Sequence, residues 1–144
     1  MLSEESAAPT FVGVVRQSDA NHMGHASPAC YADMFDAADW VFFTRHGLTR
    51  EYFEQSGCGM AALTQEATYQ KELFPGDAVA IFTTLVEVRE KTVRYRHYLR
   101  LVEDGELAAT SEFIAAHLDR RRHRATPFPD AILMELKTSQ APRG

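Results

Sequence analysis

The strongest constraint on the fold is a single change of hydrophobic period along the chain. Between residues 27 and 47, large apolar residues recur at helical spacing, which predicts one helix of about five turns; they are Tyr31, Met34, Phe35, Ala38, Val41 and Phe42. From residue 59 onward the pattern changes to long β-type runs separated by tight turns. A helix this apolar has to be covered, and the only large element left to cover it is an antiparallel sheet.

The ends of the long helix are marked by residue chemistry. Ser27 is a good N-cap and Pro28 is tolerated at the first helical position, while Gly47 stops the pattern. Upstream, residues 11–16 are apolar and β-branched, which predicts a strand, and residues 17–26 are polar and predict a loop.

Tight-turn sequences separate the later elements. Phe74-Pro75-Gly76-Asp77 and Asp104-Gly105 are turn and hairpin signals. Strands are predicted over residues 59–73, 78–89, 92–102 and 106–118, with short helices over 48–56 and 127–136. No βαβ unit repeats, so we expect an α+β fold: a five- or six-stranded antiparallel sheet wrapped around one long central helix. The edges of such a sheet favour dimerisation.

Length and composition set the wider limits. The chain has 144 residues, which fits one domain, expected over residues 10–137 with flexible tails at 1–9 and 138–144. A net charge of −5 argues against a nucleic-acid partner. The first residues carry no apolar signal-peptide core and no run is long enough to span a membrane, so the expected location is cytoplasmic, away from the membrane. Cys30 and Cys58 give neither a disulfide framework nor a metal motif.

Several segments, in order, carry a family resemblance. They are Asp19-Ala-Asn-His-Met-Gly-His25, Tyr31 and the residues after it, Glu66 to Asp77, Asp104 to Thr110, Ala116-His-Leu-Asp119 and Pro127-Phe-Pro129. Together they resemble the 4-hydroxybenzoyl-CoA thioesterase-like branch of the hot-dog proteins, and in particular thioesterases associated with carnitine and betaine breakdown. The resemblance covers about residues 10–137.

The resemblance implies a function as well as a fold. It implies an acyl-CoA thioesterase that works as a homo-oligomer, a dimer or tetramer, with its sites at the dimer interface and no metal or other cofactor. In such proteins a carboxylate near the loop before the helix acts on the thioester, and the helix N-terminus polarises its carbonyl. Here Asn21 stands where the family carries its usual aspartate, and Ser27 stands where it carries an asparagine.

The departure at Asn21 leaves the choice of base open. The expected catalytic residues are Asn21, Glu66, Asp19 and His25. Glu66, if buried near the helix start, would have the raised pKa of a general base, and Asp19 is the other candidate base. Asn21 and His25 would position the substrate. For each, an ordinary turn, surface or structural role is the competing interpretation.

Expected substrate-binding residues complete the set: Gly24, Tyr31, Ser27, Arg120 and Arg122. The arginines belong to a basic run at residues 119–124, which is either a solvated strand end or a contact for the CoA phosphates. Asp33, Asp36 and Asp39 repeat at helical spacing and are expected to form a polar stripe. Some hot-dog enzymes carry their acid on this helix, so the resemblance leaves Asp33 or Asp36 as a third candidate for the catalytic acid. A metal site built from Asp19, His22 and His25 is disfavoured because no further ligand cluster accompanies them.

Two other functions compete with hydrolysis. The same fold would serve as a non-hydrolytic acyl-CoA-binding protein, a sensor or carrier, and Asn21 and Ser27 favour that alternative. A hydratase or dehydratase on this fold lacks its expected His and Asp context here.

Overall fold

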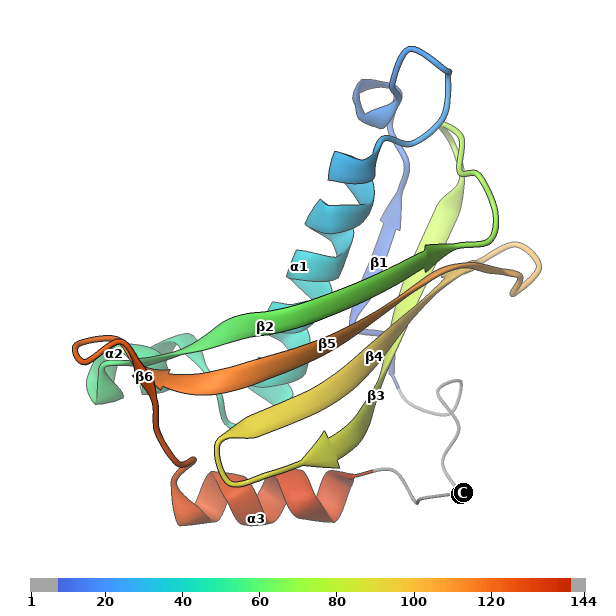
Figure 1. The fold of residues 1–144 in the computed structure, drawn as a ribbon. Coiled ribbons are helices and arrows are strands. Elements are labelled where there is room, and N and C mark those ends of the chain that lie inside the picture. The colour runs from blue at the N-terminus through green and yellow to red at the C-terminus, as the bar shows by residue number, and fades with distance from the viewer. Residues whose placement is uncertain (1–7, 141–144) are drawn as a thin grey trace.

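The long apolar helix is the axis of the molecule, and the sheet curves around it (Figure 1). In the computed structural model, which describes residues 8–140, helix α1 spans Pro28–Arg45. Ser27 caps it as predicted, because its Oγ accepts a hydrogen bond from the Cys30 N–H at 3.3 Å. The helix packs one face against the concave side of the sheet. Val41, which belongs to the predicted apolar spacing, is 38% exposed.

All strand pairs of the sheet are antiparallel. The strands are β1 (Phe11–Val14), β2 (Cys58–Tyr69), β3 (Ala78–Val88), β4 (Thr92–Leu101), β5 (Leu107–Asp119) and β6 (Arg124–Ala125). Their order is β1-β3-β4-β5-β2, and β6 pairs with β5. The α+β architecture is therefore the predicted one, although the two-residue strand β6 was not predicted. The edge strand β2 is long, whereas the other edge, β1, has four residues.

Two shorter α-helices lie outside the sheet that curves around α1. Helix α2 (Arg50–Ser56) follows α1, and helix α3 (Asp130–Ser139) lies beyond the β3–β4 hairpin (Figure 1). Helix α3 continues to Ser139, so residues 138–139 of the predicted tail at 138–144 are helical. Residues 1–7 and 141–144 lie outside the described residues. Among the helices that the structure describes, none is long and apolar enough to cross a membrane.

The alternation predicted for residues 92–102 is confirmed in β4. The side chains on one face are buried in the core: Val93, Tyr95, His97, Leu99 and Leu101. Their neighbours on β5 and the inner face of α1 complete one continuous cluster. His97 differs from the other residues of this face because it is polar and fully buried.

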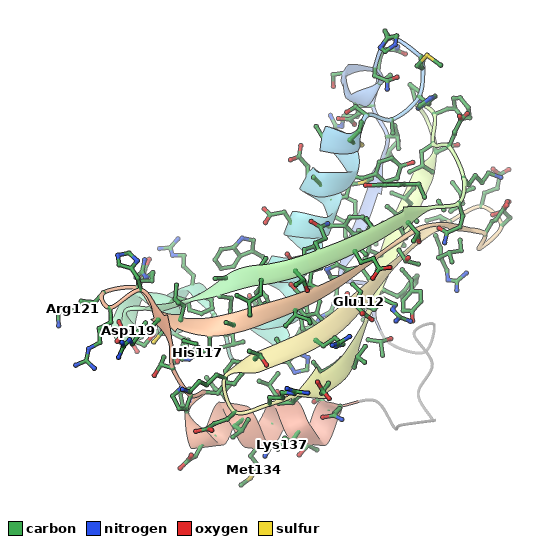
Figure 2. The ribbon with its side chains drawn as sticks, in the orientation of Figure 1. Glu112, His117, Asp119, Arg121, Met134 and Lys137 are labelled. Atoms are coloured by element: carbon green, nitrogen blue, oxygen red, sulfur yellow. The ribbon has the colours of Figure 1, made fainter. Side chains whose placement is uncertain are left out.

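A second buried histidine joins strand β5 to helix α2 and to the segment that follows β6. His117 on β5 (labelled in Figure 2) contacts the Tyr52 hydroxyl through Nε2 at 2.7 Å and the Thr126 carbonyl through Nδ1 at 2.9 Å. The neutral tautomer with the proton on Nδ1 satisfies both, because Nδ1–H donates to Thr126 and Nε2 accepts from Tyr52. Burial lowers the pKa of His117 from 6.5, outweighing the carbonyl contacts that raise it.

We therefore expect acid to destabilise the fold through His117. Because its folded-state pKa lies below 6.5, the unfolded chain binds more protons at mildly acidic pH. The contribution of neutral His117 to the free energy of unfolding is complete above pH 6.5 and falls as the pH drops toward the folded-state pKa. Urea unfolding at pH 7.5 and 5.5 should show a larger loss for the wild type than for His117→Gln. Equal losses in both would show that another group sets the pH dependence.

Candidate functional site

A pocket of about 410 Å³ opens at the start of α1, between the loop before the helix and the end of β2. Three of the predicted site residues line it: Asn21, His25 and Tyr31. The other lining residues are Ala26, Pro28, Tyr69, Gln70, Lys71 and Glu72. Residues from the two halves of the chain therefore meet at the N-terminal end of the central helix.

The loop before α1 is a small closed turn. The Asn21 N–H donates to the His25 carbonyl at 2.9 Å, and the Gly24 N–H donates to the Asn21 carbonyl at 3.0 Å. Gly24 has a φ of +82°, a left-handed conformation that glycine adopts without strain. The Asn21 Oδ1 accepts from the Met23 N–H at 2.9 Å. Asn21 thus holds the turn with its oxygen, while its amide nitrogen makes no hydrogen bond with another described residue.

The start of α1 borders the pocket. Pro28 has no N–H, and the Ser27 Oγ is occupied as the cap, so Ser27 acts on the helix. The N–H of Ala29, at the second helical position, has no intrahelical acceptor, as at any helix start. The positive end of the helix dipole therefore lies beside the pocket, where it favours negative charge.

Aromatic and charged groups form the opposite wall. The Tyr31 hydroxyl donates to the Lys71 carbonyl at 3.4 Å, and its ring packs edge-on against Tyr69 at 4.9 Å between centroids. Burial raises the pKa of Tyr31, so its hydroxyl stays protonated. The His25 Nε2 lies 3.7 Å from the Glu72 Oε1. Glu72 was missed by sequence reasoning, although it lies within the family-like segment 66–77.

Asp19 lies beside the helix start but does not line the pocket. Its Oδ2 accepts from the Arg16 N–H at 2.8 Å, and its backbone carbonyl accepts from the Ser27 N–H at 3.0 Å. Its charge is nevertheless close enough to contribute, after burial, to the raised pKa of the Cys30 thiol. The side chain is thus engaged in closing the loop, and its role as a base stays a prediction.

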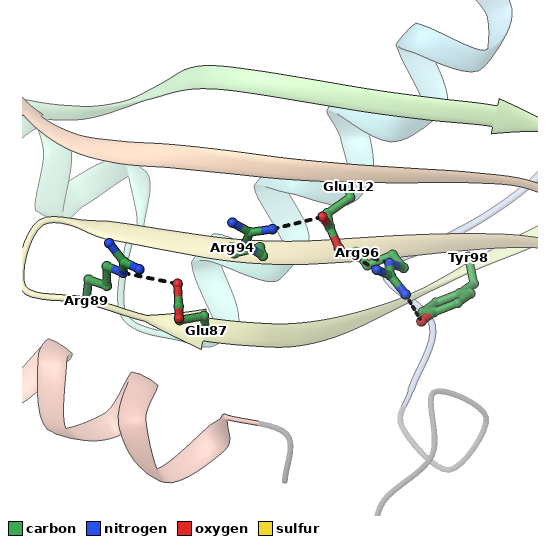
Figure 3. A network of polar contacts seen from close by, with 6 residues as sticks. All are labelled: Glu87, Arg89, Arg94, Arg96, Tyr98 and Glu112. Atoms are coloured by element: carbon green, nitrogen blue, oxygen red, sulfur yellow. Dashed lines mark hydrogen bonds and ion pairs between the residues drawn. The ribbon is translucent and has the colours of Figure 1, made fainter. Parts of the chain in front are cut away.

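Glu66 is exposed within the single chain, so the burial that would suit it to the role of a general base does not occur there. Glu66 pairs in register with Glu112, so both point to the same face of the sheet. That face is the outer one: Glu112 contacts the Arg94 Nη1 at 3.3 Å and the Arg96 Nη2 at 2.6 Å across it (Figure 3). Glu66 therefore points away from α1 and from the pocket of its own chain, and its catalytic role stays a prediction.

The basic run lies at the opposite end of the sheet. Arg120 and Arg122 belong to the exposed β5–β6 turn, where Figure 2 labels Asp119 and Arg121. The Arg120 guanidinium donates to the carbonyls of Gly57 and Phe53 at 3.3 and 3.4 Å. Within one chain, the arginines and the pocket at the start of α1 are not brought together.

A second cavity of about 380 Å³ lies further along α1. Its lining includes Asp36, Asp39, Trp40, Phe43, Phe53, Tyr95 and Arg120, together with small residues near the start of β2. Within the predicted polar stripe, Asp39 also has a buried partner, because its Oδ1 accepts from the His97 Nε2–H at 2.7 Å. The periodicity could not reveal this contact, because His97 comes from a strand 58 residues away.

No metal site is formed in the part of the chain that the structure describes. Asp19, His22 and His25 do not gather into a group of three ligands, and neither does any other set of His, Cys, Asp and Glu residues within 8–140.

Comparisons with known proteins place the chain in a family. The model of the thioesterase-like superfamily matches residues 15–136, so the chain belongs to that superfamily. A curated relative, the L-carnitine dehydrogenase/betainyl-CoA thioesterase of Agrobacterium fabrum, is 27% identical over 118 residues. That match covers 81% of this chain but 24% of the relative, so the chain spans about a quarter of the relative's length.

Solved structures confirm the hot-dog fold. A Staphylococcus aureus protein solved in complex with CoA has a TM-score of 0.85 at 23% identity, covering 93% of this chain and 86% of its own. The DHNA-CoA thioesterase of Staphylococcus aureus has a TM-score of 0.78 at 20% identity, covering 89% and 87%. At these identities the likeness shows the fold, while the superfamily match supports a thioester hydrolase as the general class.

Proposed function

We propose that this protein hydrolyses an acyl-CoA thioester to a free acid and CoA in the pocket at the start of α1. The observation that carries the proposal is the meeting of His25, Asn21 and the start of α1 around one cavity in a thioesterase-superfamily chain. A base activates water, and a hydrogen-bond donor and a helix dipole stabilise the oxyanion, so these groups together can promote hydrolysis of a thioester.

The chemistry follows from the position of each group. The His25 Nδ1–H donates to the Ala26 carbonyl at 3.4 Å, so Nε2 is the nitrogen that takes a proton from water while the water oxygen attacks the thioester carbon. The Glu72 carboxylate, 3.7 Å from Nε2, stabilises the imidazolium that forms. The Asn21 amide and the free N–H groups at the start of α1 stabilise the oxyanion that forms on the carbonyl. The carbon–sulfur bond then breaks, CoA leaves as its thiolate, and the proton held by His25 neutralises it. The sequence-derived bases Asp19 and Glu66 are alternatives to His25 in this scheme.

The active assembly that we propose is a dimer joined through β2. This strand is a 12-residue sheet edge with few of its side chains buried, and an unprotected edge pairs readily with another strand. In a two-fold antiparallel pairing, the start of one β2 lies beside the end of the other. Cys58, at the start of β2, pairs with Asp119, whereas Tyr69, at its end, lines the pocket.

This pairing would allow Arg120 and Arg122 of one chain to contact a substrate bound in the other chain. It brings the β5–β6 turn of one chain, with Arg120 and Arg122, toward the pocket of the other chain. Guanidinium groups there are suited to the phosphates of CoA. The site would then take its catalytic groups from one chain and its phosphate contacts from the second.

A charge placed at the middle of β2 should separate the dimer. Leu63 is 58% exposed at the bulge of β2, so Leu63→Arg would set two like charges near the two-fold axis. Analytical ultracentrifugation should give twice the 16.2 kDa chain mass for the wild type and a single chain mass for Leu63→Arg. Val12→Arg is the control, because Val12 is 65% exposed on the opposite edge, β1, and should leave the mass unchanged. A Leu63→Arg protein that keeps the wild-type mass rules out this interface.

Binding without hydrolysis is the second candidate function, favoured by the amide at position 21. A thiol-release assay against short, branched, aromatic and betainyl CoA esters separates the two; the betainyl ester is included because the curated relative carries that name. Turnover by the wild type supports the hydrolase. Tight binding of an ester without turnover, with activity gained in Asn21→Asp, supports the binding protein. Loss of turnover in Asp19→Asn or Glu66→Gln would transfer the role of base to that residue.

A further inference from the structure

The second cavity along α1 is lined by both aromatic rings and carboxylates. Four rings border it: Trp40, Phe43, Phe53 and Tyr95. Trp40 and Phe53 stand edge to face, with ring centroids 6.0 Å apart, and Phe43 and Tyr95 do the same at 5.6 Å. Aromatic faces carry negative partial charge and attract cations, above all weakly hydrated organic ones.

The carboxylates of the cavity differ in how they are held. Asp39 is held by the buried His97, whose Nε2–H donates to the Asp39 Oδ1 at 2.7 Å. Burial keeps the Tyr95 hydroxyl protonated by raising its pKa. Asp36, one turn earlier on α1, makes no ion pair and no side-chain hydrogen bond with any residue of 8–140. Its charge is therefore available to a ligand.

One cation, Arg120, belongs to the lining formed by the described residues. Arg120 donates to the backbone carbonyls of Gly57 and Phe53, and no ion pair joins it to Asp36 or Asp39. A hydrated metal ion does not fit this lining, because it needs several oxygen ligands rather than rings and no group of three metal ligands occurs among residues 8–140. The rings and the free carboxylate together select a compact organic cation.

We propose that this cavity binds a quaternary or similarly alkylated ammonium group, and that this group is carried by the acyl part of the thioester substrate. The second half of the proposal rests on the proposed function, whereas binding of the cation itself does not. Along α1, Asp36 and Asp39 lie about 8 and 12 Å from Tyr31, at 1.5 Å per residue. An extended acyl chain covers that distance within one chain, and a shorter acyl group reaches the cavity of the paired chain across the β2 edge.

The cavity carries its own reporter, because Trp40 is the single tryptophan of the sequence. Titration with choline should change Trp40 emission saturably. The uncharged carbon isostere 3,3-dimethyl-1-butanol should bind at least about tenfold more weakly, since it lacks the cation–π and charge contributions. Sodium chloride at equal concentration corrects for ionic strength.

Two aspartates on the same helix provide a matched pair of variants. Asp36→Asn should weaken choline binding by about fivefold or more, because it removes the unpaired charge at the cavity. Asp33→Asn, one turn away, exposed and outside the cavity lining, should leave choline binding unchanged. Both positions are exposed, so neither change should prevent folding.

The outcomes separate this inference from the proposed function. Choline binding that depends on Asp36, together with faster release of CoA from a trimethylammonium ester than from its uncharged carbon isostere, supports both. Choline binding without hydrolysis of any ester supports the cation site and overturns its link to a thioester substrate. No emission change with choline, or equal responses to choline and its isostere, overturns the cation site even if other esters are hydrolysed.

Discussion

Replacing His25 with alanine should lower kcat for thioester hydrolysis by about a hundredfold to ten-thousandfold, the range that a general base contributes. His25 lines the pocket at the start of α1, where its Nδ1–H donates to the Ala26 carbonyl at 3.4 Å and its Nε2 lies 3.7 Å from the Glu72 carboxylate. KM should change much less, because the pocket walls and the arginines of the second chain are intact. Steady-state thiol release with the best ester of the panel measures both constants.

His22 supplies the control for this loss. It belongs to the same loop, is exposed, and does not line the pocket. His22→Ala should therefore keep wild-type kcat. A His25→Ala protein that retains kcat within a few-fold of the wild type would remove His25 from the mechanism, and the Asp19 and Glu66 variants would then identify the base.

Replacing Phe35 with alanine should destabilise the protein by about 3–5 kcal/mol, the usual cost of emptying a large aromatic site in a core. Phe35 is 1% exposed on the inner face of α1, and its ring stacks on His97 with centroids 5.6 Å apart. The change leaves a cavity between the helix and the sheet and removes one wall of the buried His97 site. Urea unfolding at fixed protein concentration measures the free energy of unfolding.

Val41 on the same helix calibrates that result. Its side chain is 38% exposed, so Val41→Ala should cost less than about 1 kcal/mol. If Phe35→Ala and Val41→Ala lower the free energy of unfolding equally, then α1 is not the centre of the core.

The sequence predicted the fold because its signals were local and periodic. Ser27, Pro28 and Gly47 mark the ends of a helix whose apolar spacing identifies its buried side. The strict alternation of residues 92–102 identified the buried face of β4. Strand β6 escaped prediction because a two-residue strand has no period of its own.

The site was only partly predictable, because facing and pairing depend on register between distant strands. Asn21, His25 and Tyr31 were placed together by their motif. Glu66 was a candidate base only if it was buried, and register with Glu112 places it on the outer face. A one-residue difference in register reverses the face of a strand residue, and one sequence does not specify it.

The buried polar contacts could not be predicted from the sequence for the same reason. The bond between Asp39 and His97 joins a helix to a strand far along the chain, and no periodic pattern links the two. Glu72 was passed over because its neighbour His25 is distant in sequence, and only the closed loop at residues 20–26 brings them near.

The most direct test of the account is a crystal structure of the protein with a non-hydrolysable acyl-CoA analogue, in which a thioether or ketone replaces the thioester. The account predicts the acyl carbonyl, or its equivalent carbon, beside Asn21, His25 and the start of α1 in one chain. It predicts the CoA phosphates beside Arg120 and Arg122 of a second chain paired through β2. An analogue bound away from the start of α1, or held entirely within one chain, would contradict it.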